Sequence, residues 1–287
     1  MPAMTDQPIM SLPFMKMHAL GNDFVVLDAR NRDISLSDVF VRNIADRHRG
    51  VGFDQLAVIR NGAEDAHLQF YNADGSISSA CGNATRCIAR YLMTQMGRID
   101  LSLTTDHGTL AAKDKGGGLT SVNMGLPLVE WQDIPLSEAV DTLLVPLDGT
   151  PVATSMGNPH CTFFVEDADS VDLEHRGAVI EHHPLFPKRT NVQFASLLGE
   201  NHLRMRVWER GGGITLACGS GASAVGVAAH RAGLSGRVNE IVMDGGMVTI
   251  DWQDDGTESG RVIMQGPVAY VFRDQLSDTL DQYLRAV

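Results

Sequence analysis

The chain contains, from residue 208 to residue 225, the segment Trp208-Glu209-Arg210-Gly211-Gly212-Gly213-Ile214-Thr215-Leu216-Ala217-Cys218-Gly219-Ser220-Gly221-Ala222-Ser223-Ala224-Val225. Residues 222–230 are rich in Ala, Val and Gly and predict a helix, which places Cys218 near its start. A helix N-terminus has unpaired N–H groups and about half a unit of positive charge, so we expect the pKa of this thiol to fall below about 8.5. A buried structural cysteine beside a glycine turn is the alternative interpretation of one such segment.

A second segment repeats the arrangement in the first half of the chain. It reads Tyr71-Asn72-Ala73-Asp74-Gly75-Ser76-Ile77-Ser78-Ser79-Ala80-Cys81-Gly82-Asn83-Ala84-Thr85-Arg86-Cys87 and runs into another predicted helix at residues 88–96. With residues 80–84 aligned on residues 217–221, each cysteine follows a glycine by six positions. Chance rarely produces this match twice, so the pair favours a shared function.

The repeat extends over most of the chain. Met156-Gly157-Asn158-Pro159-His160 matches Leu20-Gly21-Asn22-Asp23-Phe24, and an apolar strand follows each motif. Asn22 lies 33 positions before Gln55 and 59 before Cys81, while Asn158 lies 33 before Asn191 and 60 before Cys218. We infer an internal duplication with a boundary between residues 125 and 152. The predicted domains are residues 14–127 and 128–268, with a C-terminal segment, 269–287, packing back on the N-terminal half.

The pattern of elements predicts an α+β fold. Many short strands and few helices occur without steady βαβ spacing. Besides the two cysteine helices, we expect helices at residues 39–48, 170–180 and 274–284, the last one amphipathic and capping one domain. Residues 131–151 are expected to be loop or edge strand. The two pseudo-symmetric domains would each wrap a mixed or antiparallel sheet around a central helix, with the active site in the cleft between them.

The composition excludes several classes of protein. The chain has 287 residues, 44% hydrophobic and 20% charged, which is enough for two ordinary domains. A net charge of −12 and a pI near 5.2 argue against a nucleic-acid partner, and no apolar run is long enough to cross a membrane. Four cysteines and 13 methionines suit a reducing cytoplasm, which is the expected location.

The duplication also predicts a chemistry. Related halves usually pack about a pseudo-two-fold axis, so Cys81 and Cys218 would face each other, each at the positive end of a helix. A carboxylate held between the two N-termini would have one sulfur on each face of its α-carbon. One thiolate could then remove the α-proton while the opposite thiol supplies another. This scheme needs no cofactor and no metal, and the sequence has no Walker motif, no Gly-x-Gly-x-x-Gly after a strand and no convincing lysine for a pyridoxal aldimine.

In its motifs the chain resembles the diaminopimelate epimerases, cofactor-independent amino-acid epimerases of lysine and peptidoglycan precursor synthesis. The matching motifs follow the family's order from residue 17 to about residue 221. They are His18-Ala19-Leu20-Gly21-Asn22-Asp23-Phe24, Gly52-Phe53-Asp54-Gln55, Asn72-Ala73-Asp74-Gly75-Ser76, Cys81-Gly82-Asn83, Arg86-Cys87, Gly157-Asn158-Pro159-His160, Asn191-Val192, Glu209-Arg210-Gly211 and Ala217-Cys218-Gly219-Ser220-Gly221.

The resemblance implies epimerisation of LL-2,6-diaminopimelate to the meso isomer. Cys81 and Cys218 would be the acid/base pair, with His160 and Glu209 assisting the proton transfers. The residues implied to contact substrate are Asn22, Gln55, Asn72, Gly82, Asn83, Asn158, Asn191, Glu209, Arg210, Gly219 and Ser220. Arg210 offers a planar fork for the remote carboxylate. The asparagines could instead be turn residues, Glu209-Arg210 an exposed ion pair, and His160 a turn histidine. A homodimer is a further expectation.

The chain departs from the family's usual pattern at two matched positions. Ile77 and Ile214 stand where the family often has glutamate, and Ala84-Thr85 replaces a common Gly-Ala pair. We expect a coordinated change in the packing or hydrogen bonding behind the cysteines, one that tunes rate or stability.

Three other interpretations stay open. A zinc site could use Cys81, Cys87, Cys218 and a histidine, but no Cys-x-x-Cys spacing supports it. A thiol–disulfide redox protein would cycle a Cys81–Cys218 bond. Proline and hydroxyproline racemases resemble this fold and use two cysteines, but their cyclic substrates lack a second amino-acid end. Cys87 and Cys161 are expected to be buried core residues.

Overall fold

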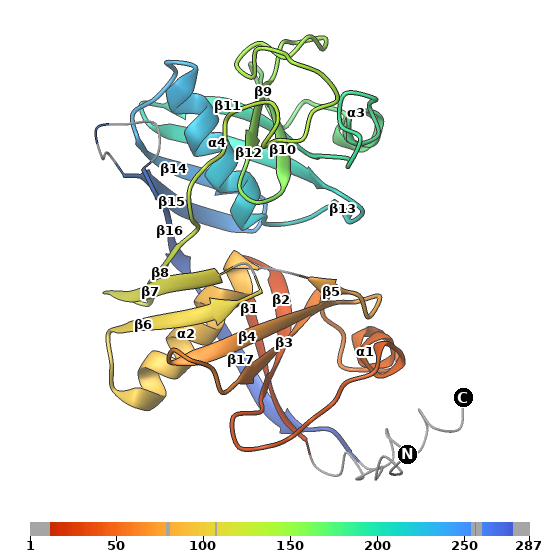
Figure 1. The fold of residues 1–287 in the computed structure, drawn as a ribbon, viewed down its shortest axis with the longest axis vertical. Coiled ribbons are helices and arrows are strands. Elements are labelled where there is room, and N and C mark those ends of the chain that lie inside the picture. The colour runs from red at the N-terminus through yellow and green to blue at the C-terminus, as the bar shows by residue number, and fades with distance from the viewer. Residues whose placement is uncertain (1–11, 79–80, 107, 254–255, 257–259, 278–287) are drawn as a thin grey trace.

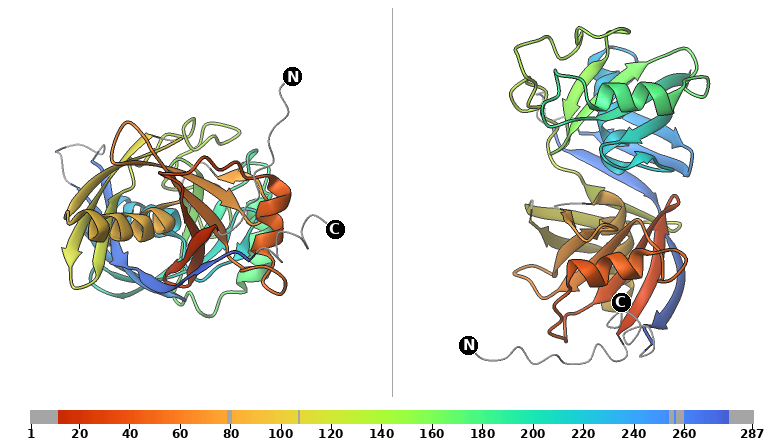
Figure 2. Two further views of the ribbon diagram at one scale, coloured as in Figure 1. Left: turned by 90° about the horizontal axis from the view of Figure 1, so that it is seen from below. Right: turned by 90° about the vertical axis from the view of Figure 1, so that its right-hand side faces the viewer.

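Each half of the chain folds as a curved sheet around one central helix, and the two lobes lie end to end (Figure 1). The computed structural model describes residues 12–78, 81–106, 108–253, 256 and 260–277. Seen from below, α2 (Gly82–Met96) is surrounded by the strands of the N-terminal lobe (Figure 2). This arrangement confirms the predicted α+β class with two related domains.

The N-terminal lobe contains the first ten elements of the chain. They are β1 (Pro13–Ala19), β2 (Asn22–Asp28), α1 (Asp38–Ala45), β3 (Gln55–Arg60), β4 (Ala66–Asn72), β5 (Ile77–Ser78), α2, β6 (Asp100–Thr105), β7 (Gly108–Gly116) and β8 (Leu119–Asn123). The C-terminal lobe follows. Its elements are β9 (Val152–Ser155), β10 (Pro159–Phe164), α3 (Leu173–Glu181), β11 (Asn191–Gly199), β12 (His202–Glu209), β13 (Gly213–Ile214), α4 (Gly219–Arg231), β14 (Val238–Met243), β15 (Gly246–Trp252) and β16 (Val262–Pro267).

The strand pairings repeat from one lobe to the other. In the N-terminal lobe β2 pairs in parallel with β3, and β4 pairs in parallel with β6. The C-terminal lobe has the same two parallel pairs, β10 with β11 and β12 with β14. The other neighbours in both lobes are antiparallel, such as β1 with β2 and β9 with β10. The topology therefore matches the duplication inferred from residue spacing, while the exact domain bounds remain a prediction.

Two pairings connect the lobes. β8 pairs antiparallel with β16, so the sheet passes from one lobe into the other. β17 (Ala269–Gln275) then runs back along the N-terminal lobe and pairs antiparallel with β1 (Figure 2). The chain therefore crosses between the lobes twice, once after β8 and once after β16.

The two central helices form the core around which the lobes assemble. In α4 the nine residues from Gly221 to Ala229, together with Gly219, are buried, and α2 buries a similar stripe. Small side chains let the surrounding strands approach α4 closely: a Cβ added at Gly226 would lie 2.8 Å from Ile250 Cγ2. Cys81 is the N-cap of α2 and Cys218 the N-cap of α4, so each helix begins one residue after its cysteine.

One local prediction needs correction. Asp274 and Gln275 were expected to begin a helix, but they end strand β17, whose pairing with β1 satisfies its backbone groups. Residues 278–284 of that predicted helix lie outside the described part of the chain. Residues 131–151 form turns, which confirms the loop alternative of their prediction, and Ile134, Leu136 and Val145 are buried in the core of the C-terminal lobe.

The fold predicts a difference between two glycine substitutions. Gly75 and Gly116 both have positive φ, at +86° and +75°, so alanine is strained at either one. A Cβ at Gly75 would also lie 2.6 Å from the Asp38 carbonyl oxygen, whereas Gly116 has open space around it. We expect Gly75→Ala to lower the free energy of unfolding by about 1–3 kcal/mol more than Gly116→Ala, measured by urea denaturation. Equal losses would contradict this packing of the Asp74-Gly75 turn on α1.

Candidate active site

The two N-cap cysteines occupy equivalent positions at the starts of α2 and α4. The Ala84 backbone N–H donates to Cys81 Sγ at 3.4 Å. Cys218 Sγ lies 3.6 Å from Ser220 Oγ, and the Gly221 N–H also points to it. Cys81 is partly exposed, whereas Cys218 is only 5% exposed. Each sulfur therefore faces the unpaired N–H groups of its own helix.

The packing brings these two helix starts together. α2 contacts α4, and Met264 of β16 lies between their first residues. A Cβ added at Gly219 would be 3.0 Å from Met264 Cε and 3.2 Å from Asn83 Oδ1, and one added at Gly82 would also be 3.0 Å from Met264 Cε. The residues that follow Cys81 and Cys218 are thus neighbours across the interface between the lobes.

Burial, rather than the helix N-terminus, controls the acidity of both thiols. Loss of hydration raises the pKa of Cys81 to about 12, although the N–H groups of Ala84 and Asn83 oppose the shift. Burial also raises the pKa of Cys218 well above its ordinary value, and the Glu209 carboxylate adds to that effect. The expected lowering of these pKa values is therefore wrong for this structure, in which both sulfurs are protonated near neutral pH.

Glu209, at the end of β12, is the acidic group of the site. Its carboxylate accepts a hydrogen bond from Thr215 Oγ1 at 2.5 Å and is hydrogen-bonded to Cys218. Its charge raises the pKa of Cys81 as well as that of Cys218. Burial raises the pKa of Glu209 itself, and its two hydrogen bonds only partly oppose this. One carboxylate therefore acts on both thiols, which supports a single shared site.

A chain of hydrogen bonds runs from the buried interior to Cys218. Gln193 Nε2 donates to His160 Nδ1 at 2.9 Å, so the other ring nitrogen carries the proton and donates to Asn158 Oδ1 at 3.0 Å. Asn158 Nδ2 then donates to Ser220 Oγ at 3.4 Å. Burial, with the charge of Arg210, lowers the pKa of His160 to about 3. His160 is thus a neutral ring that orients Asn158 in this conformation.

Asn191 and Arg210 form the outer part of this group. Asn191 Nδ2 donates to the Pro159 carbonyl at 2.9 Å, and its Oδ1 accepts the Arg210 backbone N–H at 3.0 Å. The Arg210 side chain is exposed and donates to the Lys188 carbonyl at 3.1 Å. Asn191 therefore ties the His160 turn to the Glu209-Arg210 turn, while the Arg210 fork lies at the solvent-exposed rim.

The remaining predicted amides belong to the N-terminal lobe. Asn83 Nδ2 donates to Asn22 Oδ1 at 3.2 Å, which joins α2 to the β1–β2 turn. Gln55 Nε2 donates to Asn72 Oδ1 at 2.9 Å, and Asn72 Nδ2 donates to Ser76 Oγ at 3.0 Å. The Gln55–Asn72 hydrogen bond forms because these two residues are opposite each other in the β3–β4 ladder.

An ionic cluster holds Asn22 in place. Asn22 Nδ2 donates to Asp54 Oδ2 at 2.8 Å, and Arg47 bridges Asp54 and Asp23 at 2.9 and 2.7 Å. Lys16 pairs with Asp23 at 2.6 Å. Hydrogen bonds from Arg47 and Lys16 outweigh burial and lower the pKa of Asp23, which therefore stays ionised.

Sequence reasoning missed four residues that contact the predicted ones. Asp54 belongs to the Gly52-Phe53-Asp54-Gln55 motif, and Thr215 lies just after the Gly211-Gly212-Gly213 turn. The sequence around each of them therefore indicated a position close to the site. Gln193 follows Asn191 by two positions on one face of a strand, which is also a readable pattern. Arg86 was quoted in the Arg86-Cys87 motif without a role; its Nη2 donates to Asn83 Oδ1 at 2.7 Å.

Ile77 and Ile214 do not pack behind the cysteines as expected. Their side chains are 62% and 46% exposed on the short strands β5 and β13, because these strands pair only at the sheet margin. Thr215, next to Ile214, makes the hydrogen bond to Glu209 instead. Cys87 and Cys161 are fully buried, as predicted for core residues.

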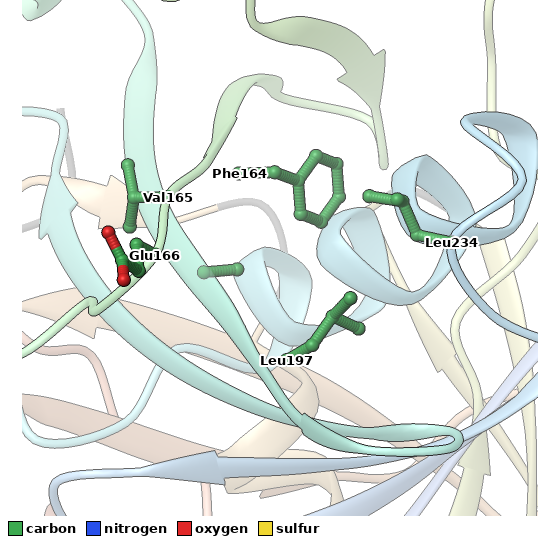
Figure 3. Close-up of a pocket in the computed structure, with 6 residues that line it drawn as sticks. Phe164, Val165, Glu166, Leu197 and Leu234 are labelled. Atoms are coloured by element: carbon green, nitrogen blue, oxygen red, sulfur yellow. The ribbon is translucent and has the colours of Figure 1, made fainter.

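One cavity of the described structure lies apart from the predicted site residues. A cavity of about 260 Å³ in the C-terminal lobe contains none of the predicted site residues (Figure 3). It is lined by Phe164, Val165, Glu166, Ala195, Leu197 and Leu234.

Within the described ranges, no three His, Cys, Asp or Glu side chains are grouped to bind a metal. No helix in the described part of the chain has the length and apolar character needed to span a membrane.

The family model and the most similar relatives agree on one family. The sequence model described as diaminopimelate epimerase matches residues 14–129 and 152–271. The diaminopimelate epimerase of Acidiphilium cryptum is 51% identical over 92% of this chain and 96% of its own, and that of Rhodospirillum centenum is 49% identical over 93% of each chain.

Solved structures share the fold at low identity. A PhzF-family phenazine biosynthesis protein of Bacillus anthracis superposes with a TM-score of 0.66 at 17% identity, covering 93% of this chain and 99% of its own. A hydroxyproline epimerase of Agrobacterium vitis, with trans-4-hydroxy-L-proline bound, gives 0.66 at 15% identity, covering 93% and 91%.

The raised thiol pKa values predict the pH dependence of alkylation. Only the thiolate reacts with iodoacetamide, and a pKa of about 12 for Cys81 keeps the thiolate fraction small across the usable pH range. In a Cys218→Ala variant, we expect the rate of Cys81 alkylation to rise about tenfold per pH unit from pH 7 to 10, followed by peptide mass analysis. A plateau below pH 9 would show that burial does not raise this pKa.

Proposed function

The chain belongs to the diaminopimelate epimerase family, and we propose that it converts LL-2,6-diaminopimelate to the meso isomer with Cys81 and Cys218 as its acid/base pair. The main support is the meeting of two helix N-termini, each capped by one of these cysteines. The reaction supplies a lysine and peptidoglycan precursor.

The proposed reaction is a proton transfer through one α-carbon. The substrate α-carboxylate binds between the N-termini of α2 and α4, where the backbone N–H groups of Gly82, Asn83, Gly219 and Ser220 can donate to it. One sulfur, as thiolate, takes the α-proton, and the C–H electron pair moves into the carboxylate as enolate character. The opposite thiol gives its proton to the other face. Hydrogen bonds that strengthen as the carboxylate gains charge lower the barrier.

Glu209 and His160 have different roles in this proposal. Glu209, hydrogen-bonded to Cys218, accepts or returns the proton of that thiol and is therefore catalytic. His160 is neutral and bonded at both ring nitrogens, so it acts through Asn158 and Ser220 as a positioning residue. The resemblance implied that His160 assists the proton transfers directly, and this proposal gives it an indirect role instead.

The remote amino-acid end of the substrate requires polar groups at the rim. Arg210 supplies a fork for its carboxylate, and the amides of Asn22, Gln55, Asn72, Asn158 and Asn191 supply acceptors and donors for the ammonium and carboxylate. Since Arg210 is exposed and the amides proposed to bind this end of the substrate lie on both lobes, we propose that the lobes close over the substrate. Closure excludes water that would protonate the carbanion.

We also propose a cytoplasmic location and a homodimer. The mechanism requires reduced thiols, and the four cysteines are free in the described structure. Tyr270, Val271 and Phe272 of β17 are 43–52% exposed, and a second copy would cover this apolar strand. Sedimentation velocity distinguishes a dimer from the 31.0 kDa monomer.

The first test removes each sulfur. We expect Cys81→Ala and Cys218→Ala each to lower kcat for diaminopimelate epimerisation by about 10³-fold or more, because general acid–base groups contribute about 10²–10⁴-fold. Cys161→Ala, which removes a buried thiol outside the site, should keep its kcat. Wild-type racemisation of proline or hydroxyproline, without turnover of diaminopimelate, would replace the proposed substrate with that of the proline racemases.

The second test concerns the remote carboxylate. We expect Arg210→Ala to raise KM for diaminopimelate by about 100-fold, since a charged pair inside the closed site is worth about 3 kcal/mol. Lys188→Ala removes a neighbouring exposed cation but keeps the backbone carbonyl that accepts from Arg210, so its KM should stay near that of the wild type. Normal substrate binding by Arg210→Ala would rule out this remote pocket.

A further inference from the structure

We propose that Arg86 is a positioning residue for the reaction: its buried guanidinium fixes the Asn83 amide between the two helix starts and places a positive charge behind Cys81. The catalytic part of this inference rests on the proposed function.

Arg86 is an unusual group for a protein interior. It is fully buried in α2, yet it has no carboxylate partner among the described residues. Its Nη2 donates to Asn83 Oδ1, while Nε and Nη1 have no hydrogen-bond partner in the described structure. A buried cation without a counter-ion is unfavourable, and this one lies one helical turn behind the anion-binding end of α2.

The fold makes a specific space for this guanidinium. A Cβ added at Gly266 of β16 would clash with Nη1, and it would lie 2.9 Å from Val248 Cγ1. Gly266 is two residues after Met264, which separates the starts of α2 and α4. Arg86 is therefore held between α2 and β16, at the junction of the two lobes.

The contact with Asn83 has a geometric consequence. A guanidinium only donates, so it can bind only the carbonyl oxygen of the Asn83 amide. That leaves Nδ2 to donate to Asn22 Oδ1 at 3.2 Å. Arg86 thereby fixes the orientation of an amide whose Oδ1 lies beside Gly219 of the opposite helix.

Of the two N-cap cysteines, the charge of Arg86 acts on Cys81 and not on Cys218. The charged and titratable groups that affect Cys81 are Glu209 on β12 and Arg86 and Cys87 on α2, and Arg86 opposes the rise in the pKa of Cys81 that burial causes. Arg86 has no comparable effect on Cys218. In α4 the position five residues after the cysteine is Ser223, a neutral side chain that donates to the Gly219 carbonyl at 2.9 Å.

The difference between the two helices defines the experiment. Arg86→Met and Arg86→Lys are each combined with Cys218→Ala, to follow Cys81, and with Cys81→Ala, to follow Cys218. Iodoacetamide alkylation is measured from pH 8 to 10 on the full-length chain. We expect Arg86→Met to slow Cys81 alkylation several-fold at pH 8, with a smaller difference near pH 10, because burial lowers the pKa of Arg86 to about 10. Cys218 alkylation should be unchanged, and Arg86→Lys should restore most of the Cys81 rate.

Arg86→Lys also separates charge from positioning. With both cysteines present, it should lower kcat, because a single ammonium does not reproduce the fork that holds Asn83, while Cys81 keeps its alkylation profile. An unchanged Cys81 rate in Arg86→Met, or an equal change at both cysteines, overturns the charge effect. Full kcat in Arg86→Lys overturns the positioning effect, and this variant decides the question if Arg86→Met does not fold. Alkylation needs no substrate, so it is independent of whether diaminopimelate is turned over.

Discussion

The structure depends on the close approach of two helix N-termini, each capped by a cysteine. α2 and α4 meet around Met264, with the glycines that follow Cys81 and Cys218 allowing contact. The curved sheets bury these helices, and the β8–β16 pairing holds the lobes together. In the proposed function, two helix starts that meet in this way would hold the substrate carboxylate between the two thiols.

The same burial that shapes the site opposes its chemistry. Removing Cys81 and Cys218 from water raises the pKa of both thiols, so the free enzyme keeps them protonated near neutral pH. The N–H groups at the helix starts and Arg86 behind Cys81 act against this rise in pKa, whereas the charge of Glu209 adds to it at both thiols. The two thiols therefore have different charged neighbours, although the strand pairings of the two halves are nearly equivalent.

Much of this arrangement could be predicted from the sequence. The repeated spacing from Asn22 to Cys81 and from Asn158 to Cys218 correctly indicated two related α+β domains, and each cysteine indeed begins a helix. Spacing could not reveal the pKa of those thiols, because burial depends on residues such as Met264 that are distant in sequence. It also could not show that Arg210 is exposed, that Ile77 and Ile214 face solvent, or that Gln193 determines the tautomer of His160. These properties arise from contacts between elements and not from any local pattern.

The most direct test of two opposed thiols is epimerisation of the LL isomer in deuterium oxide, stopped in the first few per cent of conversion. If Cys81 and Cys218 act from opposite faces, the meso product carries one deuterium at the inverted α-carbon, while the recovered LL substrate carries almost none. Deuterium appearing in recovered substrate as fast as in product, or product that retains the original proton, would mean that one base serves both faces, which contradicts the proposed site.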